Sequence, residues 1–193
     1  MSRIAISILF AGFFLAFFGT SEASGANPKV LLKTSKGDIT LELYADKAPG
    51  TVKNFLAYVD AQFYDGLIFH RVIKGFMIQG GGLTPDYSTR TAKPPIKNEA
   101  GNGLKNDRGT LAMARSGEVD SATCQFFINH VNNDFLNHRD NTPGGFGYCV
   151  FGKVTAGLDV LDAIATTPTM TVHGMEDVPR EAVTIISIRR VEN

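Results

Sequence analysis

The sequence of 193 residues has no tryptophan, only two cysteines and no excess charge of either sign. Basic and acidic side chains number 19 each, and no long run of one sign occurs, so neither a nucleic acid nor an anionic membrane surface is indicated as a partner. Cys124 and Cys149 are too few for a disulfide scaffold, and neither lies in a Cys-X-X-Cys redox motif. Two semi-buried thiols are the favoured interpretation, and a single disulfide stays open.

The motifs of several enzyme classes are also missing. The sequence contains no Gly-X-Ser-X-Gly elbow, no His-Glu-X-X-His and no Walker loop. Its four histidines have no spacing typical of a metal site, and Gly80-Gly81-Gly82 is better explained as a sharp strand exit that needs a positive φ than as a phosphate loop. We therefore predict neither a metal nor a cofactor. His70 is expected to be a hydrogen-bonded structural residue that points away from its neighbours Phe69 and Arg71.

The first 26 residues differ from the rest of the chain. Arg3 gives a short positive region, residues 4–18 form an uncharged apolar run, and small residues near 23 and 26 offer cleavage sites. A run of about 15 residues falls short of the roughly 20 needed to cross a bilayer, so a signal peptide over residues 1–26 is preferred to a membrane anchor. We expect a monomer of one domain, 27–193, exported to the periplasm or alternatively secreted, without stable membrane insertion after cleavage.

The remaining chain alternates short β-prone runs with connections rich in glycine and proline. Helices are predicted over 49–61 and 158–165, whereas 84–109 and 166–179 are expected to be irregular. Residues 183–190 carry apolar side chains on both faces, which predicts a strand covered on both sides for part of its length, by the barrel core within and a helix outside. Because few helices interrupt the strands, the fold class is predicted to be mainly β, a closed eight-stranded antiparallel barrel capped by two helices. The predicted strands are 29–34, 38–44, two runs on either side of Lys74-Gly75 within 69–82, 110–115, 125–130, 148–154 and 183–190.

Residues 69–82 contain the least usual chemistry in the chain. Arg71 and Gln79 stand among large apolar side chains such as Phe76 and Met77. An arginine is rarely buried without a partner, so this setting indicates the wall of a pocket rather than an ordinary core strand. Similar residue types recur later, as Met113-Ala114, as Gln125-Phe126-Phe127 and as Phe135-Leu136.

Four segments together form a specific pattern. They are Phe-His-Arg-Val-Ile-X-Gly-Phe-Met-Ile-Gln-Gly-Gly at 69–81, Leu-Ala-Met-Ala at 111–114, Ser-Ala-Thr-Cys-Gln-Phe-Phe-Ile at 121–128 and Val-Phe-Gly-Lys-Val at 150–154. This pattern resembles the signature of the cyclophilin-type peptidyl-prolyl cis-trans isomerases, and with the leader it is most similar to the bacterial periplasmic rotamases. The resemblance implies the capped barrel, an open groove on one outer face, and no cofactor. It also implies proline-containing peptides and unfolded or folding exported proteins as partners.

The resemblance assigns roles to individual residues. Arg71 matches the catalytic arginine of the family, Gln79 matches a carboxamide that binds the peptide backbone, and Tyr148 matches a groove position often held by histidine. The hydrophobic pocket that receives proline is matched by Phe76, Met77, Phe127 and Leu136. The site that holds the peptide main chain is matched by Ala114 and Arg115, with Gln125 beside them.

Two positions depart from the family pattern. Phe135 stands where many eukaryotic members have a tryptophan that contacts cyclosporin, and its phenylalanine is similar to bacterial members that bind the drug weakly. Weak cyclosporin binding is therefore expected. Arg115 replaces a common asparagine, a change that can alter peptide preference while the arginine and the pocket stay intact.

Two other functions stay open at this point. A non-catalytic holdase or peptide-binding module would need the pocket but no donor aimed at a prolyl nitrogen. An envelope scaffold that used only the barrel surface would need neither. The presence of Arg71, Phe76, Gln79 and Phe127 together favours the enzyme.

Overall fold

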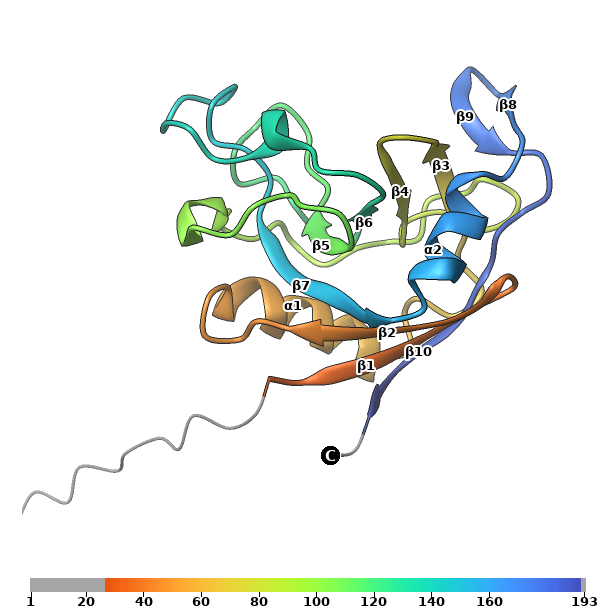
Figure 1. The fold of residues 1–193 in the computed structure, drawn as a ribbon, viewed down its shortest axis with the longest axis horizontal. Coiled ribbons are helices and arrows are strands. Elements are labelled where there is room, and N and C mark those ends of the chain that lie inside the picture. The colour runs from red at the N-terminus through yellow and green to blue at the C-terminus, as the bar shows by residue number, and fades with distance from the viewer. Residues whose placement is uncertain (1–26, 192–193) are drawn as a thin grey trace, which may run out of the picture.

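The computed structural model describes residues 27–191, so the predicted signal peptide and its cleavage sites lie outside the described residues. Eight strands form one antiparallel sheet that curves around a single interior (Figure 1). All eight were predicted, and the mainly β, antiparallel architecture is confirmed. In spatial order the strands are β10 (Ile185–Val191), β1 (Lys29–Thr34), β2 (Gly37–Leu43), β7 (Val150–Ala156), β5 (Thr110–Met113), β6 (Phe126–Asn129), β4 (Met77–Gly80) and β3 (Phe69–Ile73).

The barrel is less closed than predicted. β10 and β3 are the two edges of the sheet, and within the described residues no continuous ladder joins them. They meet at an isolated bridge between Ile68 and Thr184, and the Phe69 N–H donates to Val183 O at 2.9 Å. The sheet is therefore a half-barrel whose edges are connected through short irregular segments.

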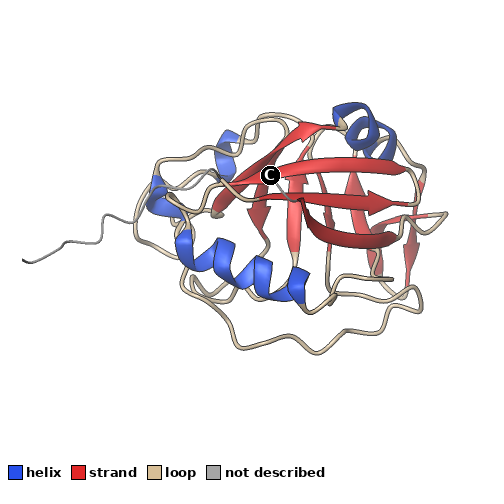
Figure 2. Cartoon of the chain, turned by 90° about the horizontal axis from the view of Figure 1, so that it is seen from below, coloured by secondary structure: helices blue, strands red, loops and turns tan. Residues whose placement is uncertain are grey.

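Two helices pack against the interior of the sheet, as predicted. α1 (Pro49–Asp60) and α2 (Leu158–Ala165) lie on separate sides of the sheet in Figure 2, and both add apolar side chains to the same core. The N-terminus of α1 is capped from a distance, because the Gly50 and Thr51 N–H groups donate to the Glu99 carboxylate at 3.1 and 2.8 Å. Neither of these described helices is long and apolar enough to span a membrane.

The long connection 84–109 is irregular, as predicted, apart from the short 3₁₀ turn η1 (Ala100–Asn102). Arg90 fixes this connection to the segment that follows α1, because its Nη1 donates to Phe63 O at 2.6 Å and to Asp65 O at 3.0 Å. Charged hydrogen bonds of this kind hold a loop that has no ladder of its own.

Residues 166–179 are not irregular throughout, which corrects the sequence prediction. β8 (Thr169–Val172) and β9 (Met175–Pro179) form a hairpin that lies beside β3 (Figure 1). Its two turn residues, His173 and Gly174, have φ of 50° and 80°, the left-handed values of a type I′ hairpin turn. Several hairpin residues are exposed, so the apolar alternation that predicted the other strands is weak here.

The sequence predicts that β10 is covered on both faces for part of its length, whereas a bulge accounts for its buried residues in the structure. The pairing with β1 shifts between Lys33 and Thr34, and this bulge lets both Ile185 and Ile188 enter the core. Ile186 is left outside, where it is 55% exposed. The bulge thus explains the imperfect alternation of the last strand.

Alternation along the central strands divides their side chains between two apolar clusters. In β6, Phe126 and Ile128 belong to the interior, whereas Phe127 belongs to a smaller cluster on the outer face. In β5, Leu111 faces inward and Ala112 outward in the same way. The central sheet is therefore covered on both sides. The outer cluster consists of Met77, Ala112, Phe127, Leu136 and Val150.

Cys124 and Cys149 are both buried free thiols, which agrees with the favoured interpretation of the sequence. Burial raises the pKa of the Cys149 thiol to about 11, and burial also raises the pKa of Cys124. Because the thiolate is the reactive form, neither side chain is suited to nucleophilic chemistry at neutral pH.

His70 occupies a bulge between β3 and β4. Phe69 pairs with Gly80 and Arg71 pairs with Gln79, so His70 has no cross-strand partner. The bulge breaks the expected alternation, because Phe69 enters the interior while Arg71 faces the outer pocket described below. The His70 Nδ1 is buried without a hydrogen-bond partner among the described residues, so the predicted hydrogen bond is absent at this nitrogen.

We predict that His70 makes the fold sensitive to moderate acid. Burial, and secondarily the charge of Arg71, lowers its pKa from the usual 6.5 to about 4. The unfolded chain therefore binds one more proton between these values, and the free energy of unfolding falls as the pH drops from 6.5 to 4, by about 3 kcal/mol at most. Urea unfolding of the wild type and of His70→Gln at several pH values measures this effect.

The His70→Gln variant should lose less stability than the wild type across that window. Hydrogen bonds from Arg190 and Arg189 lower the pKa of Asp60 and Asp65 below the usual 3.8, so their contribution to stability also begins to fall near pH 4. This loss is the same in both proteins and cancels in the comparison. Equal pH slopes for the two proteins would contradict the assignment.

Candidate functional site

The outer face of the central strands carries a pocket of about 270 Å³. Two further predicted site residues, Gln125 and Phe135, contact side chains of the pocket wall. Segments far apart in the sequence meet here because β4, β5 and β6 are neighbours in the sheet. The pocket is lined by nine of the predicted site residues, namely Arg71, Phe76, Met77, Gln79, Ala114, Arg115, Phe127, Leu136 and Tyr148.

The floor of the pocket is apolar. Met77 from β4, Phe127 from β6 and Leu136 from the 3₁₀ turn η2 (Asp134–Leu136) are 2%, 4% and 8% exposed. They belong to the outer cluster, so their positions are fixed by packing on the back of the sheet. A floor of this kind favours an apolar ring over a charged group.

Arg71 stands at the rim of the pocket with 45% of its side chain exposed. Its Nε lies 3.9 Å from Asp177 Oδ2, a carboxylate of β9. Among the described residues Nη1 and Nη2 make no hydrogen bond, so both can donate to a ligand. The sequence analysis missed Asp177, because the hairpin that carries it was expected to be irregular.

The carboxamide of Gln79 is held by a second carboxamide. Gln79 Nε2 donates to Gln125 Oε1 at 3.0 Å, which fixes both amides beside the pocket. The glycines after β4 make room for this pair, since a Cβ on Gly82 would lie 2.5 Å from Gln125 Nε2. Gly81 has φ +87°, as expected for the sharp strand exit.

Arg115 organises the opposite side of the pocket. Its Nε donates to Gly147 O at 2.9 Å, and its Nη2 donates to Pro143 O at 2.9 Å. The guanidinium carbon lies 5.0 Å from the centre of the Tyr148 ring, a cation–π contact. The side chain therefore fixes the loop before β7 and the tyrosine wall together.

Phe135 extends the apolar surface beyond the pocket. Its ring is 64% exposed and stacks on Phe76, with 5.5 Å between the ring centres. This ring pair forms the outer lip of the site, where a ligand can cover it.

The sequence analysis also missed the polar support of the turn between β3 and β4. Asn133 Nδ2 donates to Phe76 O at 2.9 Å and to Asn129 Oδ1 at 2.7 Å. Asn129 and Asn133 are 0% and 2% exposed. Asn129 ends β6, and Asn133 lies in the polar run after it, which looks like an ordinary surface loop until tertiary contacts bury it.

The arrangement combines an apolar floor, a guanidinium with free donors at the rim, and fixed amides along one side. No group of three side chains that could hold a metal ion occurs within residues 27–191. Such a site suits the noncovalent binding of a short peptide segment that carries one apolar ring.

Comparisons with known proteins agree with this geometry. A family model described as cyclophilin type peptidyl-prolyl cis-trans isomerase/CLD matches residues 29–190. The chain is 55% identical over 159 residues to peptidyl-prolyl cis-trans isomerase B of Escherichia coli (strain K12), covering 82% of this chain and 97% of that protein. It is 46% identical over 192 residues to peptidyl-prolyl cis-trans isomerase A of Dickeya dadantii (strain 3937), covering 100% of both.

Solved structures extend the likeness to the fold. The crystal structure of a cyclophilin type peptidyl-prolyl cis-trans isomerase from Cryptosporidium parvum is similar with a TM-score of 0.74 and 30% identity, covering 86% of this chain and 99% of that one. A crystal structure of the same protein in the presence of the dipeptide Ala-Pro is similar with a TM-score of 0.73.

The family match spans nearly all of the described chain, and the relatives are similar along almost their whole length. The family and the enzyme class predicted from the sequence are thereby confirmed. The protein is an isomerase of peptide bonds that precede proline, and this chain belongs to the cyclophilin-type peptidyl-prolyl cis-trans isomerases.

Proposed function

We propose that the protein isomerises X-Pro bonds of exported proteins in the periplasm, with Arg71 as the catalytic residue. The observation that carries the proposal is the guanidinium of Arg71, whose Nη groups are free at the rim of an apolar pocket. As the bond twists, the prolyl nitrogen becomes pyramidal and gains a lone pair. Arg71 then donates a hydrogen bond to that nitrogen, and no covalent intermediate is needed.

The size of the barrier shows what the pocket has to supply. Rotation about a peptide bond meets a barrier of roughly 18 to 20 kcal/mol, and uncatalysed X-Pro isomerisation takes tens to hundreds of seconds. Bringing this to milliseconds takes about five decades, or about 7 kcal/mol. A hydrogen bond from a charged group contributes roughly 1.5 to 3 kcal/mol, so Arg71 alone is not enough.

The remaining stabilisation comes from a preorganised site that binds the twisted bond better than either planar form. Met77, Phe127 and Leu136 hold the prolyl ring on the dry floor, where few water molecules compete with the guanidinium. The fixed amide of Gln79 and the chain at Ala114 hold the flanking peptide. Because these groups are packed before the peptide binds, little ordering remains to be done.

The proposed clients are proline-containing segments of unfolded or folding exported proteins. Support for the periplasm comes from the leader-like residues 1–26, with secretion as the alternative. The balance of 19 basic and 19 acidic side chains favours partners of no particular charge over nucleic acid. A monomer presents the groove freely to such segments.

A holdase that binds the same segments without turnover is the second candidate. The stacked pair of Phe76 and the exposed Phe135 favours it, because an apolar lip can bind unfolded chains with no help from an arginine. The two functions differ in what they require of Arg71.

The first prediction concerns Arg71→Ala and Arg71→Lys. Loss of one charged hydrogen bond to the twisted bond should lower kcat/KM on an X-Pro peptide by roughly 10- to 100-fold in the alanine variant. The lysine variant should stay impaired, since a point ammonium cannot reproduce the planar fork. Arg190→Ala is the matched control, because Arg190 pairs with Asp60 beside α1, outside the pocket. Near wild-type kcat/KM in folded Arg71→Ala would refute the mechanism.

The second prediction separates the enzyme from the holdase. If isomerisation assists folding, Arg71→Ala should slow the refolding of a proline-limited client while it still suppresses aggregation as the wild type does. The measurement is refolding and light scattering on the same client with both proteins. Unchanged refolding rates would favour the holdase.

The third prediction concerns cyclosporin. The wild type should be inhibited weakly, and Phe135→Trp should lower the inhibitory concentration, because the larger indole adds apolar area and an N–H donor at the exposed lip. Titration of isomerase activity with cyclosporin tests this. A variant no more sensitive than the wild type would show that Phe135 does not limit the drug.

A further inference from the structure

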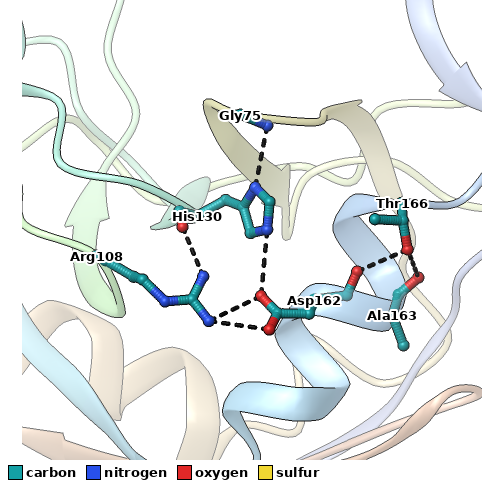
Figure 3. A network of polar contacts seen from close by, with 6 residues as sticks. All are labelled: Gly75, Arg108, His130, Asp162, Ala163 and Thr166. Atoms are coloured by element: carbon teal, nitrogen blue, oxygen red, sulfur yellow. Dashed lines mark hydrogen bonds and ion pairs between the residues drawn. The ribbon is translucent and has the colours of Figure 1, made fainter.

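His130 holds the turn between β3 and β4 at two points. Its Nδ1 accepts a hydrogen bond from the Gly75 N–H at 3.0 Å (Figure 3). Its own backbone N–H donates to Phe76 O at 2.9 Å. The imidazole directly follows β6 and is only 13% exposed. One residue thus connects the end of a central strand to the turn that begins the pocket wall.

The contact with Gly75 fixes the protonation of the ring. A backbone N–H is a donor, so Nδ1 must be the unprotonated, accepting nitrogen of the imidazole. The single ring proton of the neutral form then lies on Nε2, which is 3.1 Å from Asp162 Oδ1 of α2. The geometry of the turn contact therefore belongs to neutral His130.

The other side of the ring faces an ion pair. Arg108, from the loop before β5, lies with its Nη2 2.9 Å from both carboxylate oxygens of Asp162 and donates from Nη1 to His130 O at 2.7 Å. Thr166 Oγ1 donates to Asp162 O at 2.8 Å, which adds a contact within α2 (Figure 3). Asp162 Oδ1 is nevertheless buried without a well-aligned hydrogen bond from any described residue.

The imidazole thus lies between two groups with opposite requirements. Gly75 requires an acceptor at Nδ1, whereas the negative charge of Asp162, 3.1 Å from Nε2, attracts a proton to the ring and the positive charge of Arg108 opposes it. Asp162 and Arg108 are the charged groups that contact His130, and Lys74 is the charged residue within the turn itself. Protonation places a hydrogen on Nδ1 against the Gly75 N–H, so that contact is lost while the pair with Asp162 strengthens.

We propose that His130 is a positioning residue for the proline pocket, holding the β3–β4 turn in its neutral form and releasing it when protonated. The inference rests on the proposed function, because the turn matters through the pocket residues that follow it. Phe76 and Met77 come directly after Gly75 and line the pocket. Asn133 keeps its own bond to Phe76 O, so the turn loosens without unfolding.

Two substitutions divide the contacts of the ring between them. In His130→Asn, the amide oxygen stands near the place of Nδ1 and can accept from Gly75, but the side chain is too short to reach Asp162. In His130→Gln, the amide nitrogen can approach Asp162, but no acceptor remains at the place of Nδ1. The pair therefore isolates the turn contact from the ion pair.

The experiment measures isomerase activity from pH 8 to 5.5 by NMR exchange on an Ala-Pro peptide, which needs no coupling protease. Wild-type kcat/KM should fall by about fivefold on acidification, chiefly through KM, as one neutral hydrogen bond is lost. His130→Asn should match the wild type at pH 8 and stay nearly constant, and His130→Gln should be low throughout. His70 does not interfere, because burial holds its pKa at about 4.

A second readout does not depend on activity. Exchange of the Gly75 amide proton, corrected for the intrinsic effect of pH, should lose protection in acid in the wild type and keep it in His130→Asn. If Arg71→Ala loses activity but keeps the pH-dependent protection of the Gly75 amide, both proposals are supported. If Arg71→Ala keeps its activity, only the catalytic role of Arg71 is refuted. The role of His130 would be overturned if His130→Asn lost as much isomerase activity in acid as the wild type does. It would also be overturned if protection of the Gly75 amide did not change with pH in either protein.

Discussion

The site depends on one constraint, which is that the central strands are buried on both faces. All four residues of β6 are buried, and their alternation sends Phe126 to the interior and Phe127 to the pocket floor. A shift of register by one residue would exchange these roles and remove both the core and the pocket. The pocket is therefore the outer surface of the same packing that holds the barrel together, and its floor is packed as part of the sheet.

Polar groups around this floor are mostly engaged with the protein itself. Arg115 is bound to loop carbonyls, and the two carboxamides of Gln79 and Gln125 are bound to each other. Arg71 differs, because its ion pair with Asp177 is long and engages only Nε. The bulge at His70 produces this exception, since it turns Arg71 outward without moving Phe69 from the core. A local defect in a ladder thus directs the guanidinium of Arg71 toward the pocket.

Support for the pocket reaches well behind it. In the segment after β6, His130 and Asn133 form hydrogen bonds with the β3–β4 turn. Asp162 of α2 contacts the His130 ring in turn. None of these residues stands out in the sequence, because a polar run after a strand is typical of a surface loop. Asn129 and Asn133 become structural only because other segments cover them. These contacts depend on which segments the fold brings together, and the pattern of residues along the chain does not show this.

The sequence by itself determined the eight strands, both helices and the residue types of the pocket, because apolar alternation and the motif at 69–81 are local in the chain. It did not determine the β8–β9 hairpin, whose exposed residues carry little alternation, or the bulges at His70 and Ile186, where the pairing with the neighbouring strand of the sheet breaks the period. It also could not show that the barrel stays open between β10 and β3. Only the tertiary structure decided these features, because each depends on hydrogen bonds between strands that leave no apolar period in the sequence.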